Sequence, residues 1–162
     1  MTADVLPDAA TAFGQRVRAR LQNDTVIWIV TVGADGRPQP NPVGFCRDGG
    51  ADSTEFVIYS RPDSHRLKHL RERPDKVSFH FDSDGHGQDI VVLHGRVVVD
   101  DDHPVIQDWP PYLEKYGPAV ERVFGSIAKF SESYPIALRV TITGVRGFYV
   151  RGWERLTVVA TR

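Results

Sequence analysis

Short apolar runs rich in β-branched and aromatic residues recur along the chain, and clusters of Gly, Pro, Asp and Ser separate them. This pattern predicts strands joined by tight turns. The predicted strands are Thr25–Val32, Arg37–Cys46, Glu55–Ser60, Val77–Phe81, Ile90–Asp100, Ile136–Thr143, Gly147–Arg151 and Leu156–Ala160. Many strands with tight connections favour an antiparallel barrel. Because Gly inside a strand often marks a bulge, Gly95 is the expected bend in the long fifth strand.

Helical periodicity is confined to three places. Phe13, Val17 and Leu21 recur every four residues and predict an amphipathic helix. A second helix is expected to begin after Asp63 or Ser64 and to end before Pro74. Residues 101–133 contain helical patches interrupted by prolines, so this segment is predicted to be an insert of two short helices.

Three prolines stand at alternate positions of one predicted strand, at Pro38, Pro40 and Pro42. Proline has no N–H to donate to a β-ladder, and residues two apart in a strand share an orientation. The strand therefore cannot donate hydrogen bonds on one side. We predict an edge strand, or one left open beside a ligand, whose proline-rich half is unpaired or irregular.

The length, net charge and cysteine content of the chain are ordinary for a single-domain protein. Its 162 residues fit a single domain over 1–162, with residues 1–8 expected to form a loose leader. A net charge of −1 excludes nucleic-acid or membrane binding driven by overall charge. The absence of a signal pattern or a long apolar run predicts a cytoplasmic protein. The lone Cys46 is interpreted as a buried side chain.

The region from Arg61 to Arg73 is locally basic. Its charged residues are Arg61, Arg66, Lys68, Arg71 and Arg73 against Asp63 and Glu72, so five basic minus two acidic residues give +3. His65 and His69 add possible donors. The cluster spans a strand end, a turn and the start of a helix, where phosphate groups bind readily. From the residues alone, both a phosphate site and a solvated helix face remain open.

Other chemistry has little support in the sequence. The His residues lack the spacing of metal ligands, no nucleophile elbow is present, and the G-x-G-x-x-G fingerprint is absent. Aromatic residues are interpreted as packing groups, some of which could wall a flat ligand. These residues are Trp109, Tyr112, Phe124, Phe130 and Trp153. An enzyme of this kind would need a cofactor to carry the reaction.

Three segments, "WIVTVGADGRPQPNPVGF", "FVIYSRPDSHRLKHLRERPDKVSFHF" and "IVVLHGRVVVDDD", together resemble the pyridoxamine 5′-phosphate oxidase-like split-barrel flavoproteins. More narrowly, they are similar to the branch that uses the deazaflavin coenzyme F-420. The resemblance runs from Leu21 to Asp102, with the segments in the family's order and spacing.

The resemblance implies a mainly β fold, a six-stranded antiparallel split barrel with flanking helices, that forms a homodimer with cofactor sites at the interface. It implies a cofactor site built from Asn41, Pro42, Val43, Gly44, Ile58, Tyr59, Ser60, Arg61, Arg66 and Lys68. Ser60, Arg61, Arg66 and Lys68 would line the phosphate pocket, while Asn41, Val43 and Gly44 would face the ring. Trp109, Tyr112 or Trp153 would arrive from the partner subunit.

The activity implied is hydride transfer between reduced coenzyme F-420 and a conjugated small-molecule acceptor. FMN is the alternative cofactor, and a non-catalytic cofactor-binding protein is a third possibility, since a fold does not fix a function. Coenzyme F-420 also carries an anionic oligoglutamyl tail. Arg16, Arg18 and Arg20 on the first predicted helix are candidates to bind that tail.

Overall fold

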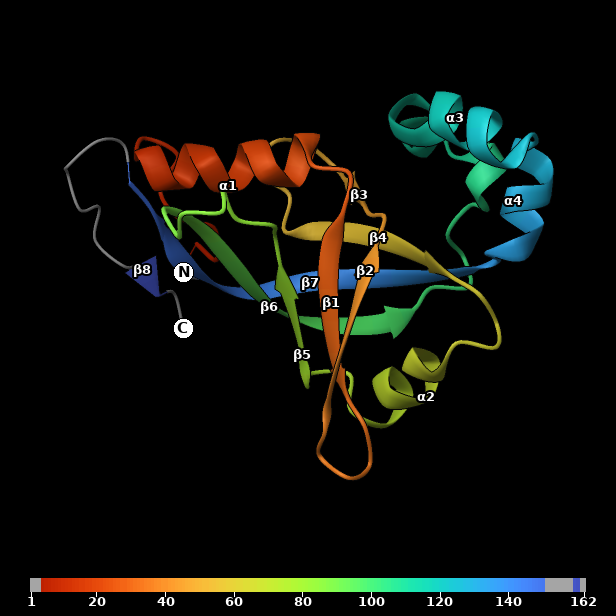
Figure 1. Ribbon diagram of the computed structural model, residues 1–162, viewed down its shortest axis with the longest axis horizontal. Helices are drawn as coiled ribbons and strands as arrows, with labels where there is room; N and C mark the ends of the chain where they lie inside the picture. The colour runs from red at the N-terminus through yellow and green to blue at the C-terminus, as the bar shows by residue number, and fades with distance from the viewer. Residues whose placement is uncertain (1–3, 151–158, 161–162) are drawn as a thin grey trace.

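The computed structural model describes residues 4–150 and 159–160. Its elements are α1 (Ala12–Asn23), β1 (Ile27–Val32), β2 (Pro38–Val43), β3 (Cys46–Asp48), β4 (Glu55–Ser60), α2 (His65–Glu72), β5 (Val77–His80), β6 (Asp89–Val99), η1 (Ile106–Asp108), α3 (Pro110–Phe124), α4 (Ile127–Ser133), β7 (Ile136–Tyr149) and β8 (Val159–Ala160). All strand pairs are antiparallel, and the sheet runs in the order β2-β1-β5-β6-β7-β4-β3, with β8 on β7. The sheet curls into a half-barrel with helices at its sides (Figure 1).

The mainly β split-barrel prediction is confirmed, although the structure has more strands than the six expected. The predicted strand Arg37–Cys46 divides at Gly44 into β2 and the short β3. Conversely, where two strands were predicted, Ile136–Thr143 and Gly147–Arg151, the structure has one continuous strand, β7, which ends at Tyr149. The described strand β8 falls within the predicted strand Leu156–Ala160.

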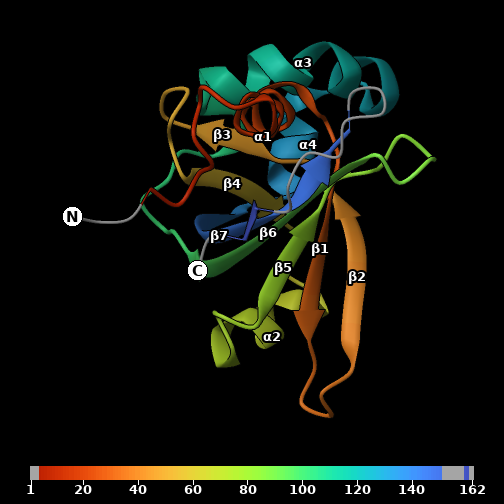
Figure 2. The same ribbon diagram turned by 90° about the vertical axis from the view of Figure 1, so that its left-hand side faces the viewer.

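The proline-rich strand β2 lies at one edge of the sheet, beside β1 (Figure 2). Its pairing with β1 is regular through all six residues, from Val43 opposite Ile27 to Pro38 opposite Val32. The edge position was predicted correctly, but the expectation of an irregular or unpaired half was wrong on the β1 side. Because the prolines have no N–H, the ladder takes its β2 donors from Gln39 and Asn41, and the proline nitrogens face the open edge.

The main core lies between the concave face of the sheet, α1 and α2. Phe56, Ile58 and Phe79 contribute rings and branched chains with no exposed surface. Phe56 and Phe79 meet edge to face with ring centroids 5.1 Å apart. Leu6, from the segment predicted to be a loose leader, also joins this core at 5% exposure.

The helical insert packs against the outer face of β3 and β4. Alternation along β4 sends Val57 and Tyr59 toward the insert, where they meet Trp109 and Tyr112 in a second apolar cluster. Instead of two short helices, the insert contains the 15-residue α3, with Pro118 inside it, and the 7-residue α4. Among the described residues, no helix is both long and apolar enough to cross a membrane.

The long strand β6 bends at the predicted glycine. Its register with β7 shifts between His94 and Gly95, which leaves Thr143 of β7 as an extra residue. A Cβ at Gly95 would lie 3.1 Å from the carbonyl oxygen of Thr141 and 3.2 Å from the ring of Phe79. The predicted irregularity at Gly95 is confirmed as a bulge, and the missing side chain lets β7 pass close to the core.

Candidate functional site

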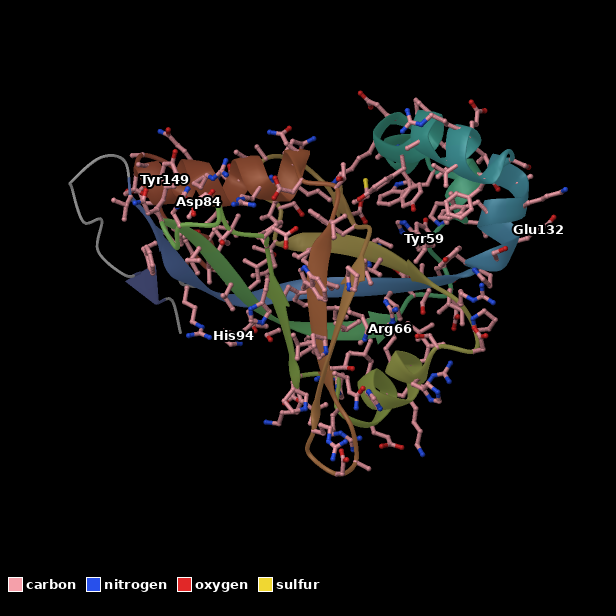
Figure 3. The ribbon with its side chains drawn as sticks, viewed as in Figure 1. Tyr59, Arg66, Asp84, His94, Glu132 and Tyr149 are labelled. Atoms are coloured by element: carbon pink, nitrogen blue, oxygen red, sulfur yellow. The ribbon has the colours of Figure 1, made fainter. Side chains whose placement is uncertain are left out.

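A cavity of about 680 Å³ lies between the barrel and the helical insert. It is formed by β1 with the two residues before it, β2, the end of β4, the first turns of α2, and the inner faces of α3 and α4. Figure 3 shows Tyr59 at the end of β4 on the insert side and Arg66 on α2, on opposite sides of this region. A cavity of this volume is in the range that holds cofactor-sized ligands.

The wall formed by β2 comes from alternate residues of the proline-rich strand. Gln39, Asn41 and Val43 share one face, and all three line the cavity together with Pro42 and Gly44. Of the predicted site residues, Asn41, Pro42, Val43 and Gly44 are therefore in the cavity wall. A Cβ at Gly44 would lie 3.4 Å from the hydroxyl of a tyrosine on α3, so glycine here lets the insert approach β2 closely.

The junction of β4 with α2 supplies the polar wall. Of the residues predicted to bind a cofactor, Tyr59, Ser60, Arg61 and Arg66 line the cavity on this side. Ser60 is 2% exposed, and its hydroxyl donates to the carbonyl of Arg61 at 3.2 Å. The exposed Arg61 forms an ion pair with Asp63 at 3.2 Å, and this hydrogen bond lowers the pKa of Asp63.

Arg66 is the half-buried cation of the cavity. Its Nε donates to Ser64 Oγ at 3.0 Å, and no carboxylate among the described residues pairs with its guanidinium. Burial lowers the pKa of Arg66, but a guanidinium stays charged at neutral pH. Ser64 is also the residue before α2, and its hydroxyl does not cap that helix. The free N–H groups of the helix start and the charge of Arg66 thus both favour an anion here.

His69 on the same helix adds a polar group to the cavity; it was a possible donor of the basic cluster but not one of the predicted site residues. His69 Nδ1 and Thr31 Oγ1 are 3.0 Å apart, and both residues line the cavity. Thr31 is only 1% exposed. Arg66 and His69 are three residues apart on α2, which places them on one face of the helix, and this spacing is the signal that would have found His69.

The helical insert forms an apolar and aromatic wall without a charged side chain. Its lining residues are Tyr112, Tyr116, Ala119, Val120, Val123, Phe124, Phe130 and Tyr134. The rings of Tyr112 and Tyr116 lie 4.7 Å apart, and those of Phe124 and Phe130 lie 4.8 Å apart. The sequence pointed to Tyr112, Phe124 and Phe130 as possible ligand walls, whereas Tyr116 and Tyr134 were missed. The spacing of four from Tyr112 to Tyr116 was the available signal.

A network of hydrogen bonds fixes this wall to the barrel. The hydroxyl of Tyr116 accepts from the backbone N–H of Phe45 at 2.9 Å and lies 2.8 Å from the carbonyl oxygens of Thr25 and Phe45. Lys115 Nζ also donates to the Phe45 carbonyl at 2.8 Å. Burial lowers the pKa of this lysine to about 8. The insert is thus tied to the connection between β2 and β3.

Two predicted site residues do not reach the cavity. Ile58 is fully buried in the main core, because side chains alternate along β4 and Tyr59 takes the cavity side. The side chain of Lys68 is 76% exposed and lies 4.0 Å from Glu72. Residues 66 and 68 of a helix point about 200° apart, so Arg66 faces the cavity and Lys68 faces solvent.

The arginines of α1 are engaged elsewhere. Arg20 and Arg16 both donate to the buried carboxylate of Asp89, with Arg20 at 2.6 Å, and Arg18 donates to Asp52 at 2.8 Å. None of the three lines the cavity. The expectation that they bind an anionic cofactor tail is therefore corrected: in the structure they hold α1 to the barrel.

Two of the three aromatic residues expected from a partner subunit, Trp109 and Tyr112, pack within this chain. Trp109 is 7% exposed and packs on Tyr59 with ring centroids 6.1 Å apart. Tyr112 reaches the cavity of its own chain. Trp153 lies outside the described residues.

Comparison with known proteins agrees with this architecture. The model of the pyridoxamine 5′-phosphate oxidase family matches residues 13–147. No curated protein sequence matched the chain.

Among solved structures, a conserved hypothetical protein from Mycobacterium tuberculosis is 18% identical with a TM-score of 0.61, covering 98% of this chain and 96% of its own. A protein related to general stress protein 26, from Clostridium acetobutylicum, is 16% identical with a TM-score of 0.56, covering 91% and 90%. An F-420 reductase is 17% identical with a TM-score of 0.54, covering 79% and 94%. At these identities the likeness shows the fold.

Proposed function

Because the chain belongs to the pyridoxamine 5′-phosphate oxidase family, we propose that it binds a phosphate-bearing flavin-type cofactor in the cavity and works as an oxidoreductase. The first candidate for the cofactor is coenzyme F-420, and FMN is the alternative. The sequence resemblance to the deazaflavin branch supports this order. The substrate would be a conjugated small molecule that accepts a hydride.

One observation carries the proposal: Arg66 is a half-buried guanidinium that has no carboxylate partner within residues 4–150, and it faces a cofactor-sized cavity. An unpaired buried charge is costly, so a bound anion would stabilise this site. Arginine can bind a phosphate through two parallel hydrogen bonds. The start of α2 and the exposed Arg61 would complete the phosphate site.

The remaining walls fit a flat ring system. A ring anchored through its phosphate at Arg66 would extend along Asn41, Val43 and Gly44, whose side chains and backbone form the β2 wall. The aromatic insert would cover its other side and exclude water. A bound reduced deazaflavin or flavin supplies a hydride, and the task of the protein is to hold an acceptor carbon about 3–3.5 Å from the donor atom.

The choice between the two cofactors is open to a direct test by fluorescence titration of the purified protein with coenzyme F-420 and with FMN. We expect submicromolar binding of coenzyme F-420 and weaker binding of FMN. The reverse order would overturn the assignment of F-420. Since the arginines of α1 are paired with carboxylates, tail binding is expected to contribute little, and shortening the oligoglutamyl tail should change the affinity only slightly.

Arg66 and Lys68 form a matched pair for testing the phosphate site. Arg66→Ala should weaken cofactor binding by about 10-fold to 100-fold, because a hydrogen-bonded charge pair is lost. Lys68→Ala should change it by less than about 2-fold, since an exposed charge contributes little. Equal effects of the two substitutions would refute the assignment of the phosphate to Arg66. Oxidation of the reduced cofactor by an added enone or quinone would separate an enzyme from a cofactor carrier.

We also propose that the chain forms a homodimer with the cavity at the interface. The exposed apolar residues Val26 and Trp28 support this arrangement, with 41% and 38% of their surface exposed. Val26 itself lines the cavity, so the exposed apolar stripe begins at the cavity mouth. A second copy covering this stripe would bury apolar surface and close the cavity on that side.

A further inference from the structure

Four tyrosines line the cavity, Tyr59 on β4 and Tyr112, Tyr116 and Tyr134 on the insert wall. The hydroxyl groups of the first three differ in their partners. The hydroxyl of Tyr59 donates to the carbonyl of Pro104 at 2.6 Å, and that of Tyr116 is bonded to Phe45. Tyr112 is only 6% exposed, yet within residues 4–150 its hydroxyl makes no hydrogen bond. Among the described residues, the Tyr112 hydroxyl is not one of the unpaired side-chain atoms that are sealed from solvent, so it is open to the cavity and free to bind a ligand.

Tyr112 lines the cavity, so the missing partner can come from a bound molecule. We propose that the hydroxyl of Tyr112 donates a hydrogen bond to the carbonyl oxygen of the acceptor substrate, a neutral, flat, conjugated carbonyl compound such as an enone or a quinone. This inference rests on the proposed function, and it assigns the substrate side of the cavity to α3.

The position of this hydroxyl is fixed by its neighbours. The ring of Tyr112 meets that of Tyr59 edge to face, with centroids 5.3 Å apart and an angle of 87°. The ring of Tyr116 covers it at 4.7 Å, and Tyr116 is held in turn by Phe45. Burial raises the pKa of the Tyr112 phenol, so the group remains a donor at neutral pH. A hydrogen bond from a fixed donor requires little reorganisation when the substrate binds.

The surroundings of Tyr112 select the class of substrate. All charged or titratable nitrogen and carboxylate groups that line the cavity come from the β4–α2 side: Arg61, Asp63, His65, Arg66 and His69. The insert side offers apolar and aromatic surface, including Val120, Phe124 and Phe130. A cofactor phosphate would occupy the charged side. The molecule bound against α3 is therefore expected to be uncharged and flat, with one hydrogen-bond acceptor directed at Tyr112.

The same hydrogen bond would act during the reaction. When a hydride from the reduced cofactor adds to the β-carbon of an enone, the electron pair of the C=C bond moves toward the carbonyl oxygen. The Tyr112 hydroxyl would stabilise the negative charge on that oxygen, and a proton from water then completes the reduction at the α-carbon. The cofactor is oxidised by two electrons and the acceptor is reduced by two.

The test uses the protein with oxidised cofactor bound and menadione, labelled with ¹³C at its carbonyl groups, as the acceptor probe. Infrared difference spectra report the carbonyl stretch of bound menadione. In the wild type this band should lie below its position in Tyr112→Phe, which keeps the ring but lacks the hydroxyl. Tyr149→Phe, at the far end of β7 (Figure 3), is the control and should match the wild type.

Kinetics provide the second readout. Tyr112→Phe should lower kcat/KM for menadione by about 10-fold or more, while cofactor affinity stays within about 2-fold. An unchanged carbonyl band in Tyr112→Phe would overturn the inference. So would a loss of cofactor affinity with the menadione band unchanged, because the hydroxyl would then serve the cofactor. The infrared band does not depend on turnover. Failure of hydride transfer together with the expected band shift would therefore count against the proposed function but not against the Tyr112 hydrogen bond.

Discussion

The hydroxyl of Tyr116 accepts a hydrogen bond from the backbone N–H of Phe45 at 2.9 Å, and so joins α3 to the connection between β2 and β3. The same oxygen lies 2.8 Å from the carbonyl oxygens of Thr25 and Phe45, and its single hydrogen can be donated to either one. Because β2 and α3 form facing walls of the cavity, this contact sets the distance between them.

Loss of this contact should be visible in stability. We expect Tyr116→Phe to lower the free energy of unfolding by about 1–3 kcal/mol, since the Phe45 N–H loses its partner. Tyr112→Phe is the matched comparison, because its hydroxyl has no partner within residues 4–150, and it should change stability by less than about 0.5 kcal/mol. Urea unfolding followed by tryptophan fluorescence measures both. Equal losses in the two variants would contradict the role given to Tyr116.

The buried carboxylate of Asp89 should make stability depend on pH. Burial opposes its ionisation, but hydrogen bonds from Arg16 and Arg20 outweigh this effect and lower its pKa in the folded protein. A lowered folded-state pKa gives stability that is complete above the unfolded value of about 4 and is lost as pH falls through the folded value. Asp89→Asn should therefore cost about 3 kcal/mol at pH 7, and the difference from the wild type should shrink below about pH 4.

The exposed pair of Arg18 with Asp52 is the control for that experiment, because the side chain of Asp52 is 80% exposed. Asp52→Asn should change stability by less than about 1 kcal/mol at any pH. Unfolding curves in urea for the three proteins at pH 7 and pH 3 give the six free energies of unfolding needed. A difference between wild type and Asp89→Asn that stays constant with pH would show that ionisation of Asp89 is not involved.

The prolines of β2 are expected to protect an open sheet edge. Pro38, Pro40 and Pro42 face that edge, so replacing all three by threonine restores three backbone donors there. The triple variant should form larger species through edge pairing, and single variants should do so less. Size-exclusion chromatography with light scattering over a range of concentrations measures this. A triple variant that elutes like the wild type would show that the prolines have another role.

The proposed dimer predicts a specific effect at Trp28. This side chain is 38% exposed, and its Nε1 donates to Asp82 at 3.0 Å on the outer face of the sheet. Placing a charge there by Trp28→Lys should convert a dimer to a monomer and weaken cofactor binding, because the cavity loses its cover. Val98→Lys, at a second exposed apolar position, tests how far the interface extends. Light scattering gives the mass, and a wild type that is monomeric at tens of micromolar would contradict the dimer.

Local patterns in the sequence were sufficient for the strands, for α1 and α2, and for much of the cavity. Alternation along β2 placed Asn41 and Val43 on one face, and the basic cluster marked the start of α2. Two errors came from ignoring the same periodicities. Ile58 could not share a face with Tyr59 in a strand, and Lys68 could not share one with Arg66 in a helix.

Other features depended on contacts between distant parts of the chain. Arg16 and Arg20 pair with Asp89, about seventy positions later, and nothing local indicated that their charges were already neutralised. The length of α3 was also missed, because Pro118 suggested a helix end, whereas tertiary packing keeps the helix intact through it. The pairing of the α1 arginines and the length of α3 are both determined by packing between elements that are distant in the sequence.

The two ends of the curled sheet are consecutive in the chain. β2 ends at Val43 and β3 begins at Cys46, so Gly44 and Phe45 alone connect the opposite ends of the sheet. Three Cα–Cα steps span at most about 11 Å. The width of the opening in the half-barrel is therefore limited by covalent geometry, not only by side-chain packing. Substitutions in the cavity walls can change the lining, but they cannot separate the two ends of the sheet at the corner where this two-residue connection joins them.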